Sequence, residues 1–194
     1  MPVPAPSPDA RAVVTGASQN IGEALATELA ARGHHLIITA RRAEVLAEVA
    51  QRITDRYGVT VEVRACDLTD PADRDKLCEE LAQRNISILC ANAGTATFGT
   101  VAELPIEGEK AQVQLNVQGV HDLVLAVLPG MIARHGGGIL ISGSAAGNSP
   151  IPNNATYAAS KAFANTFSES LRGELKPHGI NVTLLAPGPV RTEL

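Results

Sequence analysis

The segment Ala12-Val13-Val14-Thr15-Gly16-Ala17-Ser18-Gln19-Asn20-Ile21-Gly22 decides the fold of this chain. It opens with three apolar residues typical of a buried strand, turns at Gly16 and continues into a helical pattern at Ile21. A strand that runs through a glycine-containing turn into a helix N-terminus can bring its backbone close to a pyrophosphate. Asn20 stands where a middle glycine is expected, and asparagine is the residue that best imitates glycine at positive φ. The segment therefore predicts nucleotide binding, and a plain strand-to-helix turn is the alternative.

Five more short apolar runs follow, each with the pattern of a strand covered on both faces. They lie at residues 36–38, 59–65, 86–91, 138–142 and 180–186. Amphipathic helical patterns separate them, and this strand–helix alternation predicts an α/β fold. We expect a doubly wound Rossmann sheet of six parallel strands with helices on both faces.

Capping and breaking residues predict where several helices begin and end. Gly33 predicts the end of the first helix, and Asp70-Pro71 predicts a capped start for the third. The pattern over residues 117–134 contains Pro129, where we expect a kink or a break. A last long helix is expected over residues 156–176, before Pro177-His178-Gly179.

The composition favours a globular domain and excludes several classes of protein. The chain has 194 residues, of which 45% are hydrophobic and 19% charged, so wholesale disorder is ruled out. Its net charge of -4 lacks the basic excess of a nucleic-acid binder, and 3% aromatic residues are too few for a single-strand stacking platform. We expect a disordered, proline-rich arm over residues 1–10 and one domain over residues 11–194.

Neither the cysteines nor the histidines form a pattern typical of a metal site. The three cysteines are an odd set with no CxxC pair, so we interpret them as buried thiols in a reducing compartment. The pair His34-His35 has no third ligand within reach along the sequence. No apolar run approaches the ~20 residues of a membrane helix, and residues 1–9 lack the blocks of a signal peptide. We expect a cytoplasmic protein without a metal or a transmembrane segment.

Further motifs follow the later strands. They are Cys66-Asp67-Leu68, Ala91-Asn92-Ala93-Gly94, Ser144 thirteen residues before Tyr157, Lys161 four after it, and Pro187-Gly188-Pro189-Val190-Arg191-Thr192. With two tyrosines and four lysines in the chain, a Tyr-x-x-x-Lys spacing would arise by chance ~0.04 times. Together with TGASQNIG over residues 15–22, these motifs resemble those of the short-chain dehydrogenases/reductases, which are single-domain nicotinamide enzymes. The resemblance spans residues 11–194.

The resemblance implies a set of cofactor-binding residues. The first turn corresponds to the family's TGxxxGxG loop, Asp67 to its adenine-contacting aspartate, and Ala91 replaces the first residue of its NNAG turn. The segment from Pro187 corresponds to the family's PGxxxT motif, which meets the nicotinamide. The full set is Gly16, Ser18, Asn20, Ile21, Gly22, Arg41, Arg42, Asp67, Leu68, Asn92, Ala93, Gly94, Tyr157, Lys161, Pro187, Gly188, Val190 and Thr192.

The resemblance also implies that Asn116, Ser144, Tyr157 and Lys161 are catalytic. Tyr157 and Lys161 are i and i+4 on one helix, so both side chains can face the same cleft. A neighbouring ammonium favours the tyrosinate form of a tyrosine, which suits proton exchange near neutral pH. Ser144 is expected to hydrogen-bond the same carbonyl oxygen, and Asn116 to hold a water or a helix carbonyl that feeds protons to Lys161. An ordinary surface pair of tyrosine and lysine is the alternative.

The end of the second strand predicts which nicotinamide cofactor binds. An acidic residue there would bond the ribose 2′-hydroxyl of NAD(H). This strand ends in Thr39-Ala40-Arg41-Arg42, without a carboxylate. Arg41 can form a fork on a 2′-phosphate with Arg42 as a helper, so we expect NADP(H). Two solvated arginines at a helix start are the alternative.

The chain ends at Leu194, where members of the family usually continue into a substrate-covering helical segment and a further strand. We expect part of a longer protein rather than a short divergent member. The run over residues 31–42 is similar to that of a bacterial branch allied to long-chain 3-oxoacyl and 17β-hydroxysteroid reductases. TGASQNIG with ISGSAAG resembles actinobacterial reductases of β-keto lipids, including mycolate precursors. A 3-oxoacyl lipid is therefore the expected substrate, and a sugar or a small secondary alcohol the next.

The expected activity is that of an NADPH-dependent carbonyl reductase or alcohol dehydrogenase of lipid metabolism. Many members of the family pair subunits through the helices that correspond to residues 117–134 and 156–176, so we expect a homodimer or a homotetramer and no nucleic-acid partner. A non-catalytic NADP(H)-binding sensor or scaffold is the alternative from another class. An epimerase of the extended branch would have glycine at position 19, where this chain has Gln19.

Overall fold

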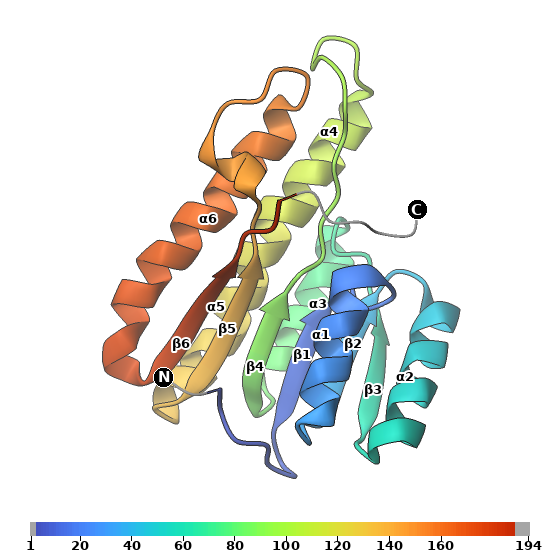
Figure 1. The fold of residues 1–194 in the computed structure, drawn as a ribbon, viewed down its shortest axis with the longest axis vertical. Coiled ribbons are helices and arrows are strands. Elements are labelled where there is room, and N and C mark those ends of the chain that lie inside the picture. The colour runs from blue at the N-terminus through green and yellow to red at the C-terminus, as the bar shows by residue number, and fades with distance from the viewer. Residues whose placement is uncertain (1–2, 189–194) are drawn as a thin grey trace.

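The computed structural model describes residues 3–188, in which one parallel sheet lies between two layers of helices (Figure 1). The strands are β1 (Arg11–Thr15), β2 (Leu36–Ala40), β3 (Val61–Ala65), β4 (Ile86–Ala91), β5 (Gly137–Ser142) and β6 (Ile180–Leu185). Their order across the sheet is β3-β2-β1-β4-β5-β6, and every neighbouring pair is parallel. The predicted six-stranded, doubly wound Rossmann fold is confirmed.

Two helices cover one face of the sheet and three cover the other. The first pair is α1 (Asn20–Ala31) and α2 (Ala43–Tyr57), and the opposite layer is α3 (Pro71–Ala82), α5 (Val120–Ala133) and α6 (Ala155–Leu175). Alternate side chains of a strand point to opposite faces. Val14 and Ile38 accordingly belong to the core under α1 and α2, whereas Val13 and Ile37 belong to the core under α3, α5 and α6.

Local sequence signals set several helix ends. The Asp70 carboxylate accepts hydrogen bonds from the backbone N–H groups of Ala72 (2.8 Å) and Asp73 (3.4 Å), which confirms the capped start of α3. A short 3-10 turn over Lys176–His178 follows α6, and Gly179 ends it at φ +70°. Glycine adopts that left-handed conformation at no steric cost, so the chain can turn directly into β6.

The region before α5 differs from the prediction. Residues 106–133 form one continuous helical stretch, made of α4 (Ile106–Val113), a π-helical segment η1 (Gln114–Gly119) and α5. α4 was not predicted because its polar sequence contains Gly108 and lacks an apolar stripe. The expected break at Pro129 is wrong, since α5 continues through that residue. Pro129 and Leu125, whose carbonyl loses its partner, are both exposed, so water can hydrogen-bond that carbonyl.

The stretch Ile106–Ala133 is the one helix within residues 3–188 that is long and apolar enough to cross a membrane by length and composition. Its apolar side has another partner in this fold. Leu123, Val124, Val127 and Met131 pack into the core under the sheet. One side of α5 therefore packs against the interior of the domain, while Leu125 on α5 is exposed.

Residues 3–10, which were expected to be a disordered arm, run across the amino ends of the strands (Figure 1). Pro6 packs beside Gly33, which follows α1, and Pro4 packs beside Gly138 in β5. Arg11 at the start of β1 donates a hydrogen bond to the Pro8 carbonyl (2.8 Å). The arm thus lies at the end of the sheet opposite to the predicted functional residues.

The strand order reverses between β1 and β4, which lie side by side at the centre of the sheet. The chain leaves β1 toward β2 and leaves β4 toward β5, so the two loops diverge. Ligands of open α/β sheets bind in the crevice that such a divergence opens beyond the carboxyl ends of the strands. Figure 1 shows that the loops after β1 and β4 both lie at this end of the sheet.

Candidate active site

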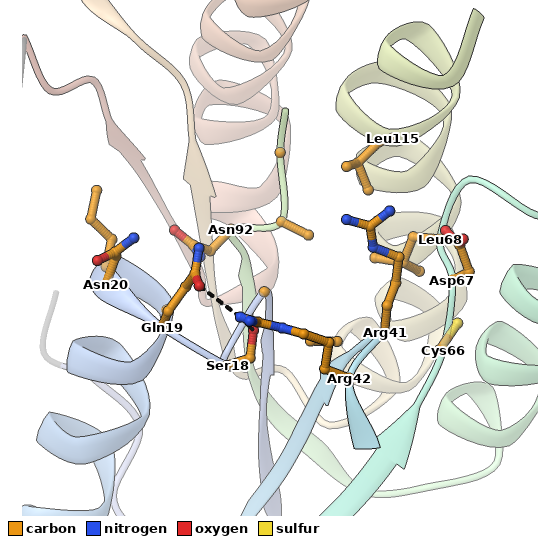
Figure 2. Close-up of a pocket in the computed structure, with 16 residues that line it drawn as sticks. Ser18, Gln19, Asn20, Arg41, Arg42, Cys66, Asp67, Leu68, Asn92 and Leu115 are labelled. Carbon is orange, nitrogen blue, oxygen red and sulfur yellow. Dashed lines mark hydrogen bonds between the residues drawn. The ribbon is translucent and has the colours of Figure 1, made fainter. Parts of the chain in front are cut away.

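A cleft of about 600 Å³ opens at the carboxyl ends of β1 to β4 (Figure 2). The structure brings together in it all the predicted cofactor residues up to position 94. They are Gly16, Ser18, Asn20, Ile21, Gly22, Arg41, Arg42, Asp67, Leu68, Asn92, Ala93 and Gly94. Gln19, Ala40, Cys66 and Leu115 also line the cleft and were not predicted.

The loop between β1 and α1 needs residues that tolerate unusual backbone geometry. Gly16 has φ +67° and Asn20 has φ +52°, so asparagine holds the positive φ that was expected of it. A Cβ on Gly22 would lie 2.1 Å from the Gly16 carbonyl oxygen, and one on Gly16 would lie 3.0 Å from the Ala93 Cα. The absence of these side chains lets the loop fold tightly over the N-terminus of α1. That is the shape in which a helix start can receive a pyrophosphate.

The two adjacent arginines after β2 point to different parts of the cleft (Figure 2). Arg42 donates hydrogen bonds to Gln19 Oε1 (2.6 Å) and Ser18 Oγ (3.3 Å), so it ties the start of α2 to the glycine loop. Arg41 instead extends toward Leu115 and makes no hydrogen bond with any residue in the range 3–188. Its guanidinium is the one that remains available to an anionic ligand.

Asp67 lies across the cleft from the glycine loop, directly after β3. Its Oδ1 accepts hydrogen bonds from the Thr69 N–H (3.0 Å) and hydroxyl (2.7 Å). Partial burial alone would raise the pKa of this carboxyl, but the Thr69 hydrogen bonds and the charge of Arg41 hold the pKa below its usual value. Asp67 therefore stays ionised and fixes the turn that carries Leu68 into the cleft.

Asn92 joins the carboxyl ends of three strands. Its Nδ2 donates to the Thr15 carbonyl (3.1 Å) at the end of β1, and its Oδ1 accepts from Ser142 Oγ (2.9 Å) at the end of β5. Ala91, which replaces the first asparagine of the family motif, is 2% exposed and belongs to the core of β4. The turn thus keeps its cross-strand bonds through Asn92.

Lys161 is a buried cation beside Tyr157. Its Nζ lies 5.8 Å from the centroid of the Tyr157 ring and donates to the Ser142 carbonyl (2.8 Å). The residue is 6% exposed, and no carboxylate among residues 3–188 forms an ion pair with it. Burial lowers the pKa of Lys161 to about 8. An unpaired buried ammonium is costly and typical of a functional site.

Asn116 lies in the π-helical segment η1, close to this lysine. Its Nδ2 donates to the Thr95 carbonyl (2.8 Å) and to Ser160 Oγ (3.0 Å), and its Oδ1 accepts from the Thr95 N–H (3.0 Å). Ser160 in turn donates to the Tyr157 carbonyl (2.8 Å). A Cβ on Gly94 would lie 3.3 Å from Asn116 Oδ1 and 3.4 Å from Lys161 Nζ, so this glycine separates the two side chains. π-Helical turns of this kind often mark functional sites.

Ser144 follows β5 and begins the short 3-10 helix η2 (Ala145–Asn148). Its Oγ accepts a hydrogen bond from the Ala146 N–H (3.1 Å), so its own hydroxyl hydrogen remains free to be donated. The Pro187 carbonyl accepts from the Ala145 N–H (3.1 Å), which places predicted cofactor residue Pro187 beside this serine. Gly188 follows it at the surface, and the predicted residues Val190 and Thr192 lie outside the described residues.

Three polar residues near Ser144, Tyr157 and Lys161 were not predicted from the sequence. Ser160 and Asn165 share helix α6 with Tyr157, and Glu109 lies on α4. Glu109 accepts hydrogen bonds from Thr97 Oγ1 (2.5 Å) and Thr156 Oγ1, and these bonds lower the pKa of its carboxyl. Ser160 lies within the Tyr-x-x-x-Lys motif, which is the signal that could have found it. Glu109 had no such signal, because its partners are distant in sequence.

Comparison with known proteins identifies the family. A family model described as short chain dehydrogenase matches residues 10–194. The chain belongs to the short-chain dehydrogenase family. This confirms the resemblance that the motifs carry, although its actinobacterial branch is not supported by a specific match.

Two relatives illustrate the range of the family around this chain. A very-long-chain 3-oxoacyl-CoA reductase of Anas platyrhynchos is 38% identical over 195 residues, which cover 97% of this chain and 62% of that protein. The chain thus spans less than two thirds of that relative. A short-chain dehydrogenase of Sphingobium yanoikuyae, solved in complex with NADPH, is 37% identical with a TM-score of 0.91 over 94% of this chain and 72% of that one.

An L-sorbose reductase of Gluconobacter frateurii, solved with NADPH and L-sorbose, is a third similar protein. It is 31% identical with a TM-score of 0.86, over 96% of this chain and 72% of that one. A comparable identity to this chain is therefore found in a 3-oxoacyl-CoA reductase and in an L-sorbose reductase. Family membership alone does not select the substrate.

Proposed function

We propose that this protein is an NADPH-dependent carbonyl reductase in which Tyr157 is the acid–base group. The observation that carries the proposal is the buried Lys161 ammonium, which has no ion-pair partner among residues 3–188 and lies 5.8 Å from the centroid of the Tyr157 ring. It lies at the carboxyl end of the sheet, next to a cleft with a glycine-rich helix start. A structural pair of tyrosine and lysine has no need of that burial, whereas an enzyme that shifts the ionisation of a tyrosine does.

The cleft fits NADP(H). The open backbone at Gly16 and Gly22 leaves room for the pyrophosphate at the start of α1, and Asp67 and Leu68 would face the adenine. Arg41, which forms no hydrogen bond with residues 3–188, would form a fork on the 2′-phosphate, while Arg42 braces the loop through Gln19. Bound NADPH supplies the hydride that reduces the carbonyl carbon.

Tyr157 would give a proton to the carbonyl oxygen of the substrate. The neighbouring Lys161 ammonium stabilises the tyrosinate that this transfer leaves. Its Nζ is held by the Ser142 carbonyl, so the cation keeps its place while the proton moves. A positioned acid–base group contributes about 10²- to 10⁴-fold to a rate.

Ser144 and Asn116 would act together with Tyr157 and Lys161. The free hydroxyl hydrogen of Ser144 would bond the same carbonyl oxygen and stabilise the charge that develops there. Asn116 would keep η1 and the Thr95 turn beside Lys161, since its amide bonds both backbone groups of Thr95. The proton path to Lys161 would run past this residue.

The proposed substrate is a 3-oxoacyl lipid, by analogy with the 3-oxoacyl-CoA reductase that the chain resembles at 38% identity. A sugar or a small secondary alcohol is the alternative, as in the similar L-sorbose reductase.

We also propose a cytoplasmic location and a homo-oligomer paired through α5 and α6. Leu125 is 50% exposed on α5, and Phe163 and Phe167 of α6 stack at 5.3 Å beside His121.

The test is NADPH consumption with short and long 3-oxoacyl thioesters, a simple ketone and a ketose, with Tyr157→Phe beside the wild type. We expect Tyr157→Phe to lower turnover about 10³-fold and to leave NADPH binding within about twofold, because only the acid is removed. The preferred carbonyl compound then names the substrate class. If the wild type binds NADPH saturably but reduces none of these compounds, the alternative of a non-catalytic NADP(H)-binding sensor is favoured.

A further inference from the structure

The side chain of Asn165 holds the backbone of Ser144 at two points. The Ser144 N–H donates to Asn165 Oδ1 (3.3 Å), and Asn165 Nδ2 donates to the Ser144 carbonyl (2.9 Å). The same Nδ2 donates to Asn148 Oδ1 (3.0 Å) at the end of η2. One primary amide thus pairs with the serine backbone much as a neighbouring strand would.

The surrounding loop leaves room for this contact. A Cβ on Gly143 would lie 2.0 Å from Asn165 Oδ1, and one on Gly147 would lie 2.5 Å from the Lys161 carbonyl carbon. Side chains at these two positions would push the loop away from α6. The glycines at both ends of residues 143–147 therefore let the serine loop lie directly on the helix, where Asn165 is 8% exposed.

Asn165 lies on the same side of the helix as the reactive group. Tyr157, Lys161 and Asn165 are spaced four residues apart, so their side chains follow one another along α6. Two of these side chains belong to the proposed proton-transfer group. The third attaches Ser144, which follows β5, to the helix that carries Tyr157 and Lys161.

We propose that Asn165 is a positioning residue that keeps Ser144 in register with Tyr157 and Lys161. The inference rests on the proposed function of Ser144. Because Ser144 Oγ accepts from the Ala146 N–H, the direction of its free hydrogen depends on where the serine backbone lies. A hydrogen-bond donor displaced by about 1 Å from a reacting oxygen can cost about 10²-fold in rate.

A double-mutant cycle separates positioning from mere stabilisation. Asn165→Leu keeps the side-chain size and removes both hydrogen bonds to Ser144. The cycle compares the wild type, Asn165→Leu, Ser144→Ala and the double variant. The probe is the 3-oxoacyl thioester or ketone that wild type reduces fastest. We expect Asn165→Leu to lower kcat about 10- to 100-fold with little change in KM for NADPH. In the Ser144→Ala background the same substitution should change kcat less than about twofold.

The outcomes are distinct. An equal loss of kcat in both backgrounds, or no loss in the wild-type background, would overturn the positioning role. If Ser144→Ala alone leaves turnover unchanged, the assigned role of Ser144 fails first, and Asn165 falls with it. If Asn165→Leu does not fold, Asn165→Asp takes its place in the cycle, since it keeps the oxygen that accepts from the Ser144 N–H.

A matched control is available on the same helix. Ser168 is fully buried and donates to the Ala164 carbonyl (2.7 Å), and it forms no hydrogen bond with residues 143–148. Ser168→Ala should lower the melting temperature yet leave kcat unchanged. A comparable fall in kcat for Ser168→Ala would mean that general loosening of α6, and not the hold on Ser144, lowers the rate.

Discussion

In the nucleotide cleft at the carboxyl ends of β1 to β4 the backbone makes the shape. In the reactive corner, which is the group of Ser144, Tyr157, Lys161 and Asn165, buried side chains make it. The cleft depends on the positive φ of Gly16 and Asn20 and on the missing Cβ of Gly22. The corner depends on Lys161 and Asn165, each 8% exposed or less and each hydrogen-bonded to a backbone group near Ser144. The two halves should therefore fail differently when they are mutated.

The difference follows from what each half must recognise. A pyrophosphate accepts several N–H hydrogen bonds at once, so an exposed helix start suffices to bind it. A single carbonyl oxygen that gains charge needs a few donors at fixed positions, and fixed positions require packed side chains. The corner thus holds a buried polar network, and a buried cation without an ion-pair partner among residues 3–188 lowers the stability of the fold.

The largest effect is expected from Lys161→Met. Turnover should fall at least about 10³-fold, because both the positive charge beside Tyr157 and the hydrogen bond to the Ser142 carbonyl are lost. The free energy of unfolding should rise by about 1–3 kcal/mol at pH 7, because a buried ammonium is removed. Burial lowers the pKa of Lys161 to about 8 in the folded protein, against 10.5 for the ordinary group. The penalty is complete below pH 8 and disappears as the pH rises toward 10.5.

Urea unfolding at about pH 7 and about pH 10 measures this change in stability. The free energy of unfolding of the wild type should approach that of Lys161→Met at the higher pH. Lys176→Met, at an exposed position just after the same helix, is the matched control and should alter neither quantity. A variant that loses stability at both pH values would contradict the idea that the corner sacrifices stability for function.

Gly22→Ala should have the next largest effect, and on the other half of the molecule. Its Cβ would lie 2.1 Å from the Gly16 carbonyl oxygen, so the loop must move away from the helix start. We expect the Kd for NADPH to rise about 10²-fold or more, while kcat at saturating NADPH falls far less. Fluorescence titration of NADPH measures the first. Gly173→Ala, at a helical position with open space around it, is the control and should bind as the wild type does.

The sequence predicted these two halves unequally, for a physical reason. The glycine loop, Asp67 and Tyr157 with Lys161 all lie in short motifs, in which neighbouring positions set the geometry. Asn165 and Glu109 act through residues twelve or more positions away, so no local pattern marks them. The π-helical segment η1 was not predicted, because its apolar residues fit an ordinary α-helix equally well. Pro129 was misjudged because exposure to water, rather than sequence, decides what a missing hydrogen bond costs.

Arg41→Asp tests how the cleft selects its cofactor. Within the part of the chain that the structure describes, Arg41 forms no hydrogen bond, whereas Arg42 is held by Gln19. Arg41 should therefore carry most of the recognition of a 2′-phosphate. We expect the ratio of NADPH to NADH affinity to fall about 10- to 100-fold for Arg41→Asp. Arg42→Ala should weaken both cofactors together, since it loosens the shared loop. The same ratio in Arg41→Asp and wild type would remove Arg41 from this account.

The smallest effect is expected from Glu62→Gln, at the outer edge of the cleft half on β3. Glu62 accepts hydrogen bonds from Arg84 (2.6 Å) and Arg11 (2.8 Å), and mainly the Arg84 bond lowers the pKa of this carboxyl to about 2. Loss of the charge should cost about 2 kcal/mol at neutral pH after allowance for solvent screening. NADPH affinity and turnover should not change, because the ion pairs lie away from both the loop and the corner.

The dependence on pH has a definite sign. A carboxyl with a lowered pKa contributes its stability above the ordinary value of about 4.5, and this contribution is lost as the pH falls toward 2. The difference between wild type and Glu62→Gln should therefore close over that window, as acid unfolding at several pH values can measure. Glu48→Gln, exposed on α2, is the control and should show no such difference. Because the Glu62 charge joins β3 to the start of β1, a difference that persists in acid would mean that packing, not charge, holds this edge.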